Sequence, residues 1–526
     1  MKRQIVLFSL VYFPITVFTG LLWIGIPELK SIVFFALWQL VMAKAIYDVI
    51  WMITAWLSKD DIPQQLSTLS ITPPVALLYT CRDDILDVSM KRLVDQDYPN
   101  YDIYILDDSK KAQSKKQVDQ CVRNLNVQDS NKRIFILRRN SIEGYKAGNL
   151  NNWLFRFGDQ YKYFVIFDND SLAEEDFITK LVRYAEHPAN ESVAIFQSLI
   201  LPWNNENYFV RWIGATAPIS MLIFKRNSNR TGTAISFGHN NLHKTFAFQE
   251  LEGFNQELTS EDTVATFELD MAGYKTKMVD VVSYESEPAD ILKYTRRAVR
   301  WAGQTMALFT HPWEKVSGAL KVELSRLMLY YFINVIFLFW ILGSIWYFDE
   351  NLTLGDQWRQ IAALRLDYDT VYFVSFVLIL FVLLLNFSLH FSLATKCEIP
   401  MYHYFGHLLL STAVFFFTMV PVTMAILKSI IGNKVKHDPS NIESGTVSLW
   451  GLIKSMKVVW LGSLAALSLY VFNHQAPWSY MGGVWALLIF LTPVFLVYVH
   501  KYTVSGEDHG YYNKNNTQIN QENSLV

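Results

Sequence analysis

The chain has 526 residues, of which 51% are hydrophobic and 15% aromatic, and this content excludes an ordinary soluble protein of this length. Its formal net charge of −2 excludes a nucleic acid or another polyelectrolyte as a general partner. The three cysteines are scattered, so they fit neither a disulfide framework nor a zinc site and suit a reducing cytosol.

Long stretches without Asp, Glu, Lys or Arg lie near both ends of the chain. They are residues 5–26, 327–348, 371–395, 404–427, 458–472 and 479–499. A bilayer crossing takes about 20 apolar residues, so most of these stretches qualify, while 458–472 needs its flanks. The first stretch is longer than a signal-peptide core and precedes a poor cleavage site, so we expect a retained helix. The sequence predicts a multi-pass protein of the plasma membrane.

A second N-terminal stretch, residues 31–57, carries only two charges, Lys44 and Asp48. Because the two residues lie four apart, one helix face holds both as a pair. Such a pair indicates a polar interior or pathway. The alternative is a position near the headgroups, with the Lys44 side chain reaching toward them.

The basic residues predict which side of the membrane each loop faces. The central stretch is rich in Lys and Arg near both membrane ends, the loop 428–457 holds five lysines, and the loop 349–369 holds five acids against two arginines. The positive-inside rule puts the first two in the cytoplasm and the last outside. If the segment 371–395 returns the chain to the cytoplasm, the segment 404–427 cannot cross the membrane a single time and still end in the cytoplasm. It lies in the interface, is re-entrant or forms a tight hairpin around Pro421. We expect six crossings, with seven as the alternative.

The chain divides into two N-terminal membrane helices (1–57), a polar domain (58–323), a C-terminal membrane and channel region (324–504) and a tail (505–526) that we expect to be disordered. In the polar domain, β-rich runs alternate with helical patterns. The runs are Val75–Tyr79, Asp102–Leu106, Arg133–Leu137, Tyr163–Phe167 and Ser192–Phe196, and the helical pieces include Met90–Asp97 and Gln113–Asn124. This alternation predicts an α/β domain with a mostly parallel, Rossmann-like sheet covered on both faces.

Acidic residues follow three of these strands, as Asp83-Asp84, Asp107-Asp108 and Asp168-Asn169-Asp170. A single pair is ordinary turn chemistry. Ligands, however, bind outside the carboxyl ends of parallel strands, so three clusters there predict one shared site. Paired carboxylates suit Mg²⁺ or Mn²⁺, which binds one or two of them plus substrate phosphates.

Basic side chains must help to hold the phosphates, because the sequence contains no glycine-rich phosphate loop. Lys146 is a candidate, since glycines on either side allow close backbone approach; alone it would be a surface lysine in a turn. Thr259-Ser260-Glu261-Asp262 is an ordinary helix start. It also places Asp262 as a candidate general base toward an acceptor hydroxyl.

The segment near 289–310 has the pattern of an amphipathic interfacial helix. Its predicted apolar stripe is Ile291, Tyr294, Ala298, Trp301, Thr305 and Leu308, and its basic residues are Lys293, Arg296, Arg297 and Arg300. The basic face binds anionic lipid, or one arginine stabilises a departing diphosphate while Trp301 stacks on a sugar ring.

The order Asp107-Asp108, Lys146-Ala147-Gly148-Asn149, Asp168-x-Asp170, Glu261-Asp262 and Arg300-Trp301 before a membrane helix resembles the membrane-integrated processive family 2 glycosyltransferases. Cellulose synthase and hyaluronan synthase are the best-known members. The resemblance covers residues 75 to about 310. It implies a GT-A fold, a UDP-sugar donor with Mg²⁺ or Mn²⁺, inversion at the anomeric carbon, and export of the polysaccharide through the enzyme's own membrane channel.

The resemblance also implies roles for the matching positions. Glu261 and Asp262 would be catalytic, with Asp262 as the base, and Asp170 would bind the metal with Asp168 nearby. The implied nucleotide and donor contacts are Thr80, Asp83, Asp107, Asp108, Lys146, Asp168, Arg297 and Arg300. The implied acceptor contacts are Gln197, Gly238, His239 and Trp301.

The chain departs from the family in several places. Arg297 stands where the family has Gln, so that acceptor contact is not implied here. The gating-loop pattern Phe-x-Val-Thr is absent, and Gly432–Asp438 matches it in location only. Gly238-His239-Asn240 with Lys244 also looks like bacterial synthases of β-1,2-linked glucans, which favours UDP-glucose and a β-glucan of a capsule or exopolysaccharide.

Three functions are compatible with these features. The first is a processive synthase that exports its product. The second is a membrane glycosyltransferase that adds a single sugar to a lipid or other membrane acceptor, but such enzymes usually lack the Arg-Trp element. The third is a transporter or lipid-binding protein with a nucleotide-sensing domain, which has no need of a base at Asp262. The sequence leaves the sugar, the linkage and any protein partner open.

Overall fold

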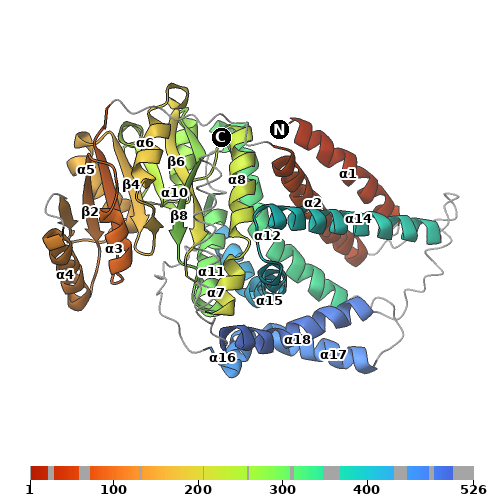
Figure 1. Ribbon diagram of the computed structural model, residues 1–526. Helices are drawn as coiled ribbons and strands as arrows, with labels where there is room; N and C mark the ends of the chain where they lie inside the picture. The colour runs from red at the N-terminus through yellow and green to blue at the C-terminus, as the bar shows by residue number, and fades with distance from the viewer. Residues whose placement is uncertain are drawn as a thin grey trace.

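The computed structural model describes residues 2–21, 29–58, 71–128, 133–204, 207–257, 260–308, 313–346, 368–431, 447–472 and 479–501. The predictions for the acidic loop 349–369, apart from its last two residues, for the segment Gly432–Asp438 and for the tail from 505 lie outside the described residues. A sheet with flanking helices forms one end of the molecule, and long apolar helices form the other (Figure 1).

One mixed sheet organises the first of these parts. Its strands are β1 Val75–Cys81, β2 Tyr101–Asp107, β3 Ile134–Leu137, β4 Tyr163–Asp168, β5 Leu172–Ala173, β6 Val193–Pro202, β7 Asn241–Lys244 and β8 Lys275–Glu285, in the order β3-β2-β1-β4-β7-β6-β8-β5. The five predicted strands are confirmed. The first four in the sheet order run parallel, β7 is antiparallel to both neighbours, and β8 is parallel to β6.

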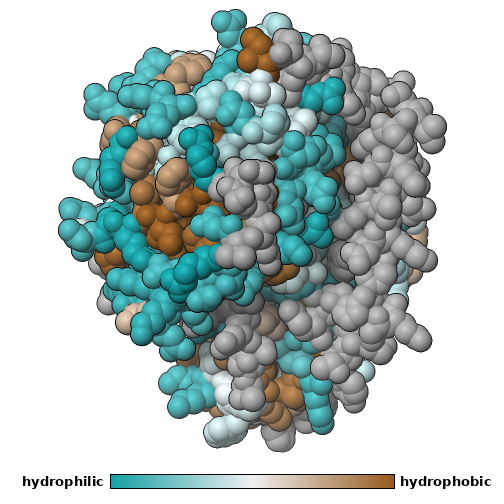
Figure 2. Space-filling view, turned by 60° about the vertical axis from the view of Figure 1, so that its left-hand side comes forward, coloured by the Kyte–Doolittle hydropathy of each residue, from teal (hydrophilic) through white to brown (hydrophobic). Residues whose placement is uncertain are grey.

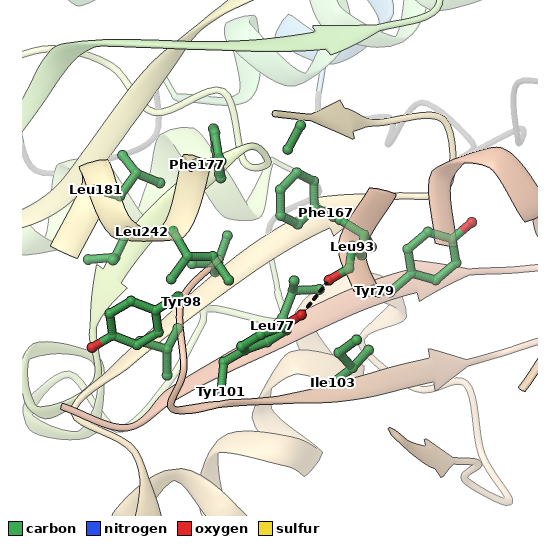
Figure 3. Close-up of a cluster of buried hydrophobic side chains, with 14 of the residues drawn as sticks. Leu77, Tyr79, Leu93, Tyr98, Tyr101, Ile103, Phe167, Phe177, Leu181 and Leu242 are labelled. Atoms are coloured by element: carbon green, nitrogen blue, oxygen red, sulfur yellow. Dashed lines mark hydrogen bonds between the residues drawn. The ribbon is translucent and has the colours of Figure 1, made fainter. Parts of the chain in front are cut away.

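Helices cover both faces of this sheet. They are α3 Asp87–Val94, α4 Ala112–Gln128, α5 Tyr145–Phe157, α6 Phe177–Ala185, α9 Thr245–Glu250 and α10 Glu261–Met271. Alternate residues of β1 face different cores: Leu77 and Tyr79 pack with α3, α4 and α6 (Figure 3), whereas Ala76 and Leu78 pack with α5, α9 and α10. Burial on both faces explains why the parallel strands are almost continuously apolar in sequence.

Two helices between β6 and β7, α7 Tyr208–Gly214 and α8 Ala217–Thr231, join the sheet to the apolar helices (Figure 1). On α8, the Arg226 guanidinium donates to the Ala55 carbonyl at 3.0 Å, and the Asn227 amide donates to the Trp51 carbonyl at 3.0 Å. These carbonyls belong to the last two turns of α2, so the two buried side chains help to tie the sheet domain to a membrane helix.

The apolar part contains α1 Lys2–Leu21, α2 Leu29–Leu57, α12 Gly318–Trp346, α14 Tyr368–Lys396, α15 Met401–Ile430, α16 Leu449–Ser455, α17 Lys457–Phe472 and α18 Ser479–Lys501. By length and composition, three helices in the described part of the chain could cross a membrane: Gln39–Leu57, Gly318–Phe339 and Met401–Ile430. The end that carries the sheet, turned forward in Figure 2, has a largely hydrophilic surface with a hydrophobic patch.

The segment 404–427 lies in one continuous helix, α15, with Pro421 inside it. The tight hairpin around Pro421 is therefore wrong, because this proline does not end the helix. α15 packs against α7, α12 and α18 and against the interfacial helix α11, Ile291–Ala307. The approach to α7 is close, since a Cβ at Gly406 would lie 2.4 Å from the Trp212 ring.

The predicted amphipathic helix near 289–310 is present as α11, with its start capped by the Asp290 carboxylate at the amides of Leu292 and Lys293. The predicted stripe is partly wrong, because the Trp301 side chain is exposed. Ala302 and Met306 are buried in its place, against α10, α12 and α15. Helical spacing alone could not show which neighbours α11 would meet.

Candidate active site at the carboxyl edge of the sheet

Most strand ends meet at one edge of the sheet. β6 and β8 point in the same direction as β1 to β4, because β6 and β4 both pair with antiparallel β7. The turn Gly238–Asn240, which precedes β7, belongs to the same edge. The three predicted acidic clusters are brought together there, since they follow the neighbouring strands β2, β1 and β4.

Asp168 is held by side chains from two other elements of this edge. Its Oδ1 accepts a hydrogen bond from the Lys146 ammonium at 2.6 Å and another from the Thr80 hydroxyl at 2.9 Å. Burial alone would raise the pKa of Asp168, but Lys146 and His239 outweigh burial and hold the pKa well below its usual range. Asp168 is therefore an anionic anchor for Lys146, and Thr80 positions it.

Lys146 lies at the start of α5, next to the left-handed residues Gly144 and Tyr145, whose φ angles are 70° and 48°. Besides Asp168, its ammonium donates to the Gly238 carbonyl at 3.2 Å and lies 3.9 Å from the Glu261 carboxylate. The predicted lysine thus belongs to the acidic edge, and it is not a surface residue of a turn.

Asp262 lies in the first turn of α10, beside Gly238. Its Oδ1 accepts hydrogen bonds from the Ser260 hydroxyl at 2.9 Å and the Thr263 amide at 2.7 Å. A Cβ at Gly238, whose φ is +80°, would lie 2.7 Å from the Asp262 Cβ and 3.0 Å from its Oδ2. No hydrogen bond from the described residues reaches Oδ2, so this oxygen is available to take a proton.

Glu261, the other acid of this pair, has a different environment from Asp262. Burial, with the Asp262 carboxylate adding to it, raises the pKa of Glu261 to about 7 even though Lys146 opposes the shift. The two predicted catalytic acids thus lie in different environments, and the Glu261 carboxylate faces Lys146.

Asp170 meets groups from the end of β8. Its Oδ2 accepts a hydrogen bond from the Ser286 hydroxyl at 2.6 Å. Burial raises the pKa of Asp170 to about 7, and the Glu285 carboxylate adds to the shift. The negative charge around Asp170 is therefore only partly compensated by the protein.

His239 lies between Glu285, which ends β8, and Asp168, which ends β4. Its Nε2 is 3.2 Å from Glu285, and its Nδ1 is 3.8 Å from Asp168. Burial alone would lower the pKa of His239, but Glu285 and Asp168 outweigh burial and raise it to about 9. The structure therefore makes His239 a partner of the acids around Asp170. Its predicted acceptor contact stays a prediction.

Several other predicted site residues are held by protein groups. Asp83, with a φ of 65°, accepts the amides of Lys110 and Lys111 at 3.0 and 2.8 Å. Asp107 is buried and bound by Arg138 at 2.6 Å, and Asp108 is bound through both oxygens by Arg139. These acids therefore hold neighbouring loops in place at the edge.

Gln197 supports the site from inside the protein, whereas Lys244 lies away from the site. Gln197 is fully buried; its side-chain oxygen accepts the Phe237 amide at 2.8 Å, and its amide donates to the His239 carbonyl at 3.2 Å. It fixes the Gly238–Asn240 turn and exposes no surface to an acceptor. Lys244 lies at the opposite edge of the sheet, paired with Tyr163 at the start of β4.

The interfacial helix α11 brings cations to this edge. Arg297 forms an ion pair with Glu287, and its guanidinium lies 4.8 Å from the centre of the Trp301 ring and 5.5 Å from that of Tyr294. Arg300 lies three residues further along, with no ion pair to any described residue. The charge of Arg297 is thus balanced by Glu287 and its guanidinium lies near two aromatic rings, while the predicted donor contact of Arg300 stays a prediction.

Five functional residues were missed in the sequence: Arg138, Arg139, Glu285, Ser286 and Glu287. The arginines directly follow β3, a strand whose end carries no acid. The other three end or follow β8, a strand that was not predicted. The available signal for β8 was the run of β-branched and aromatic residues over 276–284, which is typical of a strand.

The carboxylates fit a divalent cation held mainly by a phosphorylated ligand. Mg²⁺ and Mn²⁺ need only one or two protein carboxylates when substrate phosphates complete the shell. Asp170 offers such an oxygen in a region of uncompensated negative charge, whereas Asp168 is occupied by Lys146. Among the described residues, no group of three or more His, Cys, Asp or Glu side chains is arranged around a metal position.

The His239 pKa predicts a stability effect. A histidine whose folded pKa is about 9, above the ordinary 6.5, contributes stability that is complete below pH 6.5 and is lost as the pH rises through 9. We expect the thermal midpoint of the metal-free protein to fall between pH 6.5 and 9, and to fall less in His239→Gln. If the thermal midpoints of wild type and His239→Gln, measured in the same detergent, fell equally, the result would contradict an ion pair between His239 and Glu285.

Comparison with curated proteins identifies relatives that share the name glucans biosynthesis glucosyltransferase H. The protein of Caulobacter vibrioides is 26% identical over 216 residues, which are 38% of this chain and 32% of the relative. The protein of Cereibacter sphaeroides is 30% identical over 195 residues, 34% of this chain and 32% of the relative. The chain thus matches about a third of the length of these relatives.

Among solved structures, a mannosyltransferase of Pyrobaculum calidifontis in complex with GDP-mannose and Mn²⁺ aligns with 76% of this chain and 99% of its own, at 14% identity and a TM-score of 0.48. TarS of S. aureus, residues 1–349, in complex with UDP-GlcNAc covers 71% of this chain and 97% of its own, at 11% identity and a TM-score of 0.33.

The family profile of glycosyl transferase family group 2 matches residues 163–500, well over half of the chain. The match begins at β4, which ends at Asp168 just before Asp170, and extends through α10 and α11 to the last apolar helix. With its mixed, parallel-rich sheet and its acidic carboxyl edge, the chain belongs to glycosyl transferase family group 2.

Proposed function

We propose that the protein transfers a sugar from a UDP-sugar, with UDP-glucose favoured, to a growing β-linked polysaccharide with inversion at the anomeric carbon. The transfer is processive, and the product leaves through the protein's own membrane helices. The sheet domain, near residues 58–323, is cytoplasmic, and the apolar helices lie in the plasma membrane.

The observation that carries this proposal is the meeting of a base, a cation and an acid around Gly238. Lys146 donates to both Asp168 and the Gly238 carbonyl, and Gly238 packs directly against Asp262. A glycine is required there, because a side chain would displace the Asp262 carboxylate. A cation for a diphosphate thus lies beside an unoccupied carboxylate oxygen for an acceptor hydroxyl.

The chemistry follows from these groups. Asp262 Oδ2 takes the proton of the acceptor hydroxyl as that oxygen attacks the anomeric carbon from the side opposite the diphosphate. Lys146 and Arg300 bind the diphosphate as it departs with the bonding electrons. Mg²⁺ or Mn²⁺, when bound at Asp170, supplies further positive charge to the phosphate oxygens. An α-linked donor gives a β-linked product.

We propose six membrane crossings, by α1, α2, α12, α14, α17 and α18, with α15 lying along the membrane surface. This assignment satisfies the positive-inside rule for the loops on either side. Burial supports it: 61% of the most apolar window of α15 is buried inside the protein, against 44% and 39% for the other two long helices. The directions of the helices also support this assignment, since α15 is seen end-on in Figure 1 while α14 and α18 run across the view.

An export path would start between α2, α11 and α12. Charged and aromatic side chains lie on these helices. Asp48 pairs with Lys44 on the same face of α2, as the sequence predicted. Arg326 of α12 pairs with Glu323 at 3.4 Å and lies 5.5 Å from the Trp51 ring centre. Charges and aromatic rings at membrane depth are typical of a polar pathway.

Glucose is favoured as the sugar because the curated relatives are named as glucosyltransferases of glucan biosynthesis. Glucose is thus supported by the relatives alone. The donor is therefore best determined by trial of each common UDP-sugar.

The product decides between the two enzymatic functions. Purified protein in liposomes, with sheet domains facing outward, would be given each UDP-sugar in turn, and the product would be sized and located. We expect one sugar to give a polymer of high molecular weight that is protected inside the liposome. A short or lipid-linked product on the outer face would instead support transfer of a single sugar to a membrane acceptor.

A further inference from the structure

We propose that Arg139 is a positioning residue for Lys146, acting through the turn that carries this lysine. Asp108, Arg139 and the backbone of residues 143–145 form a clamp, and the clamp holds the ammonium of Lys146 against the diphosphate of the donor. The inference rests on the proposed function, because it assigns a task to a lysine that the proposed function uses.

Arg139 makes four hydrogen bonds that join two parts of the edge. Its Nε and Nη2 donate to the two oxygens of Asp108 at 2.8 and 2.6 Å. Its Nη1 donates to the Glu143 carbonyl at 2.7 Å, and Nη2 also donates to the Tyr145 carbonyl at 2.6 Å. The side chains of Arg139 and Asp108 are each only 11% exposed. The bidentate pair is thus sheltered from water and fixed in orientation.

The turn held in this way needs external support. Gly144 and Tyr145 are both left-handed, and Tyr145 is not a glycine. Within the turn, the Tyr145 amide donates to the Ile142 carbonyl at 3.1 Å. The Tyr145 side chain is about half exposed. Arg139 binds the carbonyl of Glu143, just before this pair, and that of Tyr145, its second member, and the next residue is Lys146. The planar guanidinium fork therefore fixes the direction in which α5, and with it Lys146, begins.

Gly148 provides an independent sign that the clamp is closely packed. A Cβ at Gly148 would lie 2.1 Å from the Glu143 carbonyl oxygen and 2.7 Å from Arg139 Nη1. A backbone atom cannot give way as a flexible side chain can. The glycine of the sequence Lys146-Ala147-Gly148-Asn149 is thus explained by the room that the clamp needs.

The neighbouring arginine offers a matched control. Arg138 follows the same strand and also binds an acid of β2, donating to Asp107 at 2.6 Å. Its other bonds go to α4, to Asp119 at 2.8 Å and to the Lys115 carbonyl at 3.0 Å. None of these contacts reaches residues 143–146. Arg138 and Arg139 therefore share charge and chemistry and differ in whether they bind the lysine turn.

The clamp also changes the expected role of Asp108. The resemblance to family 2 enzymes implies a donor contact for this acid. Both of its oxygens are taken by Arg139, so Asp108 anchors the turn from the end of β2. Its effect on the donor is indirect, through Lys146.

The test is a double-mutant cycle measured as UDP release from the preferred donor. Arg139→Gln should raise the donor KM and lower kcat, with kcat/KM falling on the order of 10- to 100-fold. In a Lys146→Ala background, the same change should cost less than about threefold, because the residue that it positions is already absent. Arg138→Gln should lower kcat/KM by the same factor in both backgrounds.

A second variant guards against misfolding. Gly148→Ala pushes the clamp open without removing any polar group, and its loss should likewise disappear in the Lys146→Ala background. The thermal midpoint of each variant identifies any that is unfolded. Equal losses from Arg139→Gln in both backgrounds, or wild-type activity in both clamp variants, would overturn the inference alone. Binding of UDP in the presence of Mn²⁺ distinguishes failure of this inference from failure of the proposed function. A wild-type protein that neither binds nor releases UDP overturns the proposed function and this inference together.

Discussion

Asp262→Asn is expected to lower kcat for sugar transfer by about 10²–10⁴-fold, the range for loss of a general base. Asn keeps the size of the side chain and can still accept the hydrogen bonds from Ser260 and the Thr263 amide through its oxygen. It cannot take a proton at the position of Oδ2. Binding of UDP should be unchanged, because the role proposed for Asp262 is toward the acceptor hydroxyl. The measurement is kcat at saturating donor and metal.

A matched control for this variant lies on the same helix. Asp270→Asn removes a carboxylate from the other end of α10, where it accepts the amide and hydroxyl of Ser317 at 2.7 Å each. We expect it to transfer sugar at nearly the wild-type rate, even if it is less stable. An Asp262→Asn protein that keeps more than about a tenth of the wild-type kcat has lost too little for a general base, and the proton would then have to go elsewhere.

The second large effect is expected from Asp170→Asn. Asp170 is a half-buried carboxylate whose negative charge the protein compensates only in part, since Glu285 lies nearby and Ser286 supplies one hydrogen bond. Loss of this charge should weaken the metal site and lower activity by about 10²–10³-fold, as for other electrostatic groups that act on developing charge. A chelator should bring wild type down to a similar level.

The measurement for Asp170 is a titration of activity with Mn²⁺. The variant should need far more Mn²⁺ for half-maximal activity than wild type. Asp176→Asn is a suitable control, because this acid pairs with Lys180 on α6 and lies outside the edge. If Asp170→Asn and wild type respond to Mn²⁺ alike, then Asp170 is not the metal ligand.

The parallel half of the sheet was predictable because its strands are buried on both faces. Tyr163–Phe167, for example, is a continuous apolar run that ends in acids, and the structure has it as β4 with the same start. β8 was not predictable in this way, since its exposed residues, such as Lys275 and Asp280, interrupt the apolar pattern. Its place beside β6 depends on pairing between residues far apart in the chain.

The site was predictable in its composition but not in its pairing. Parallel strands bring Asp83, Asp107 and Asp168 to one edge whatever their partners are. The sequence could not show that Arg138 and Arg139 bind Asp107 and Asp108 at the end of β2, or that Lys146 binds Asp168. These partners come from β3 and α5, and side-chain direction at a sheet edge depends on the turn that follows each strand.

The membrane part shows the same limit. Charge counts predicted that α15 does not cross the membrane once, but they could not choose among three geometries. The structure excludes one of them, the hairpin, because α15 is a continuous helix that packs against α7, where Gly406 admits the Trp212 ring. The exposure of Trp301 has a similar cause, since α11 meets its neighbours through Ala302 and Met306.

The central claim is that the carboxyl edge of the sheet is a metal-dependent site of UDP-sugar transfer. Release of UDP by purified wild type, offered each common UDP-sugar with and without Mg²⁺ or Mn²⁺, tests this most directly. We predict release from one donor, with UDP-glucose first, only in the presence of the metal. Absence of UDP release from every donor, with no binding of UDP in the presence of Mn²⁺, would contradict the claim.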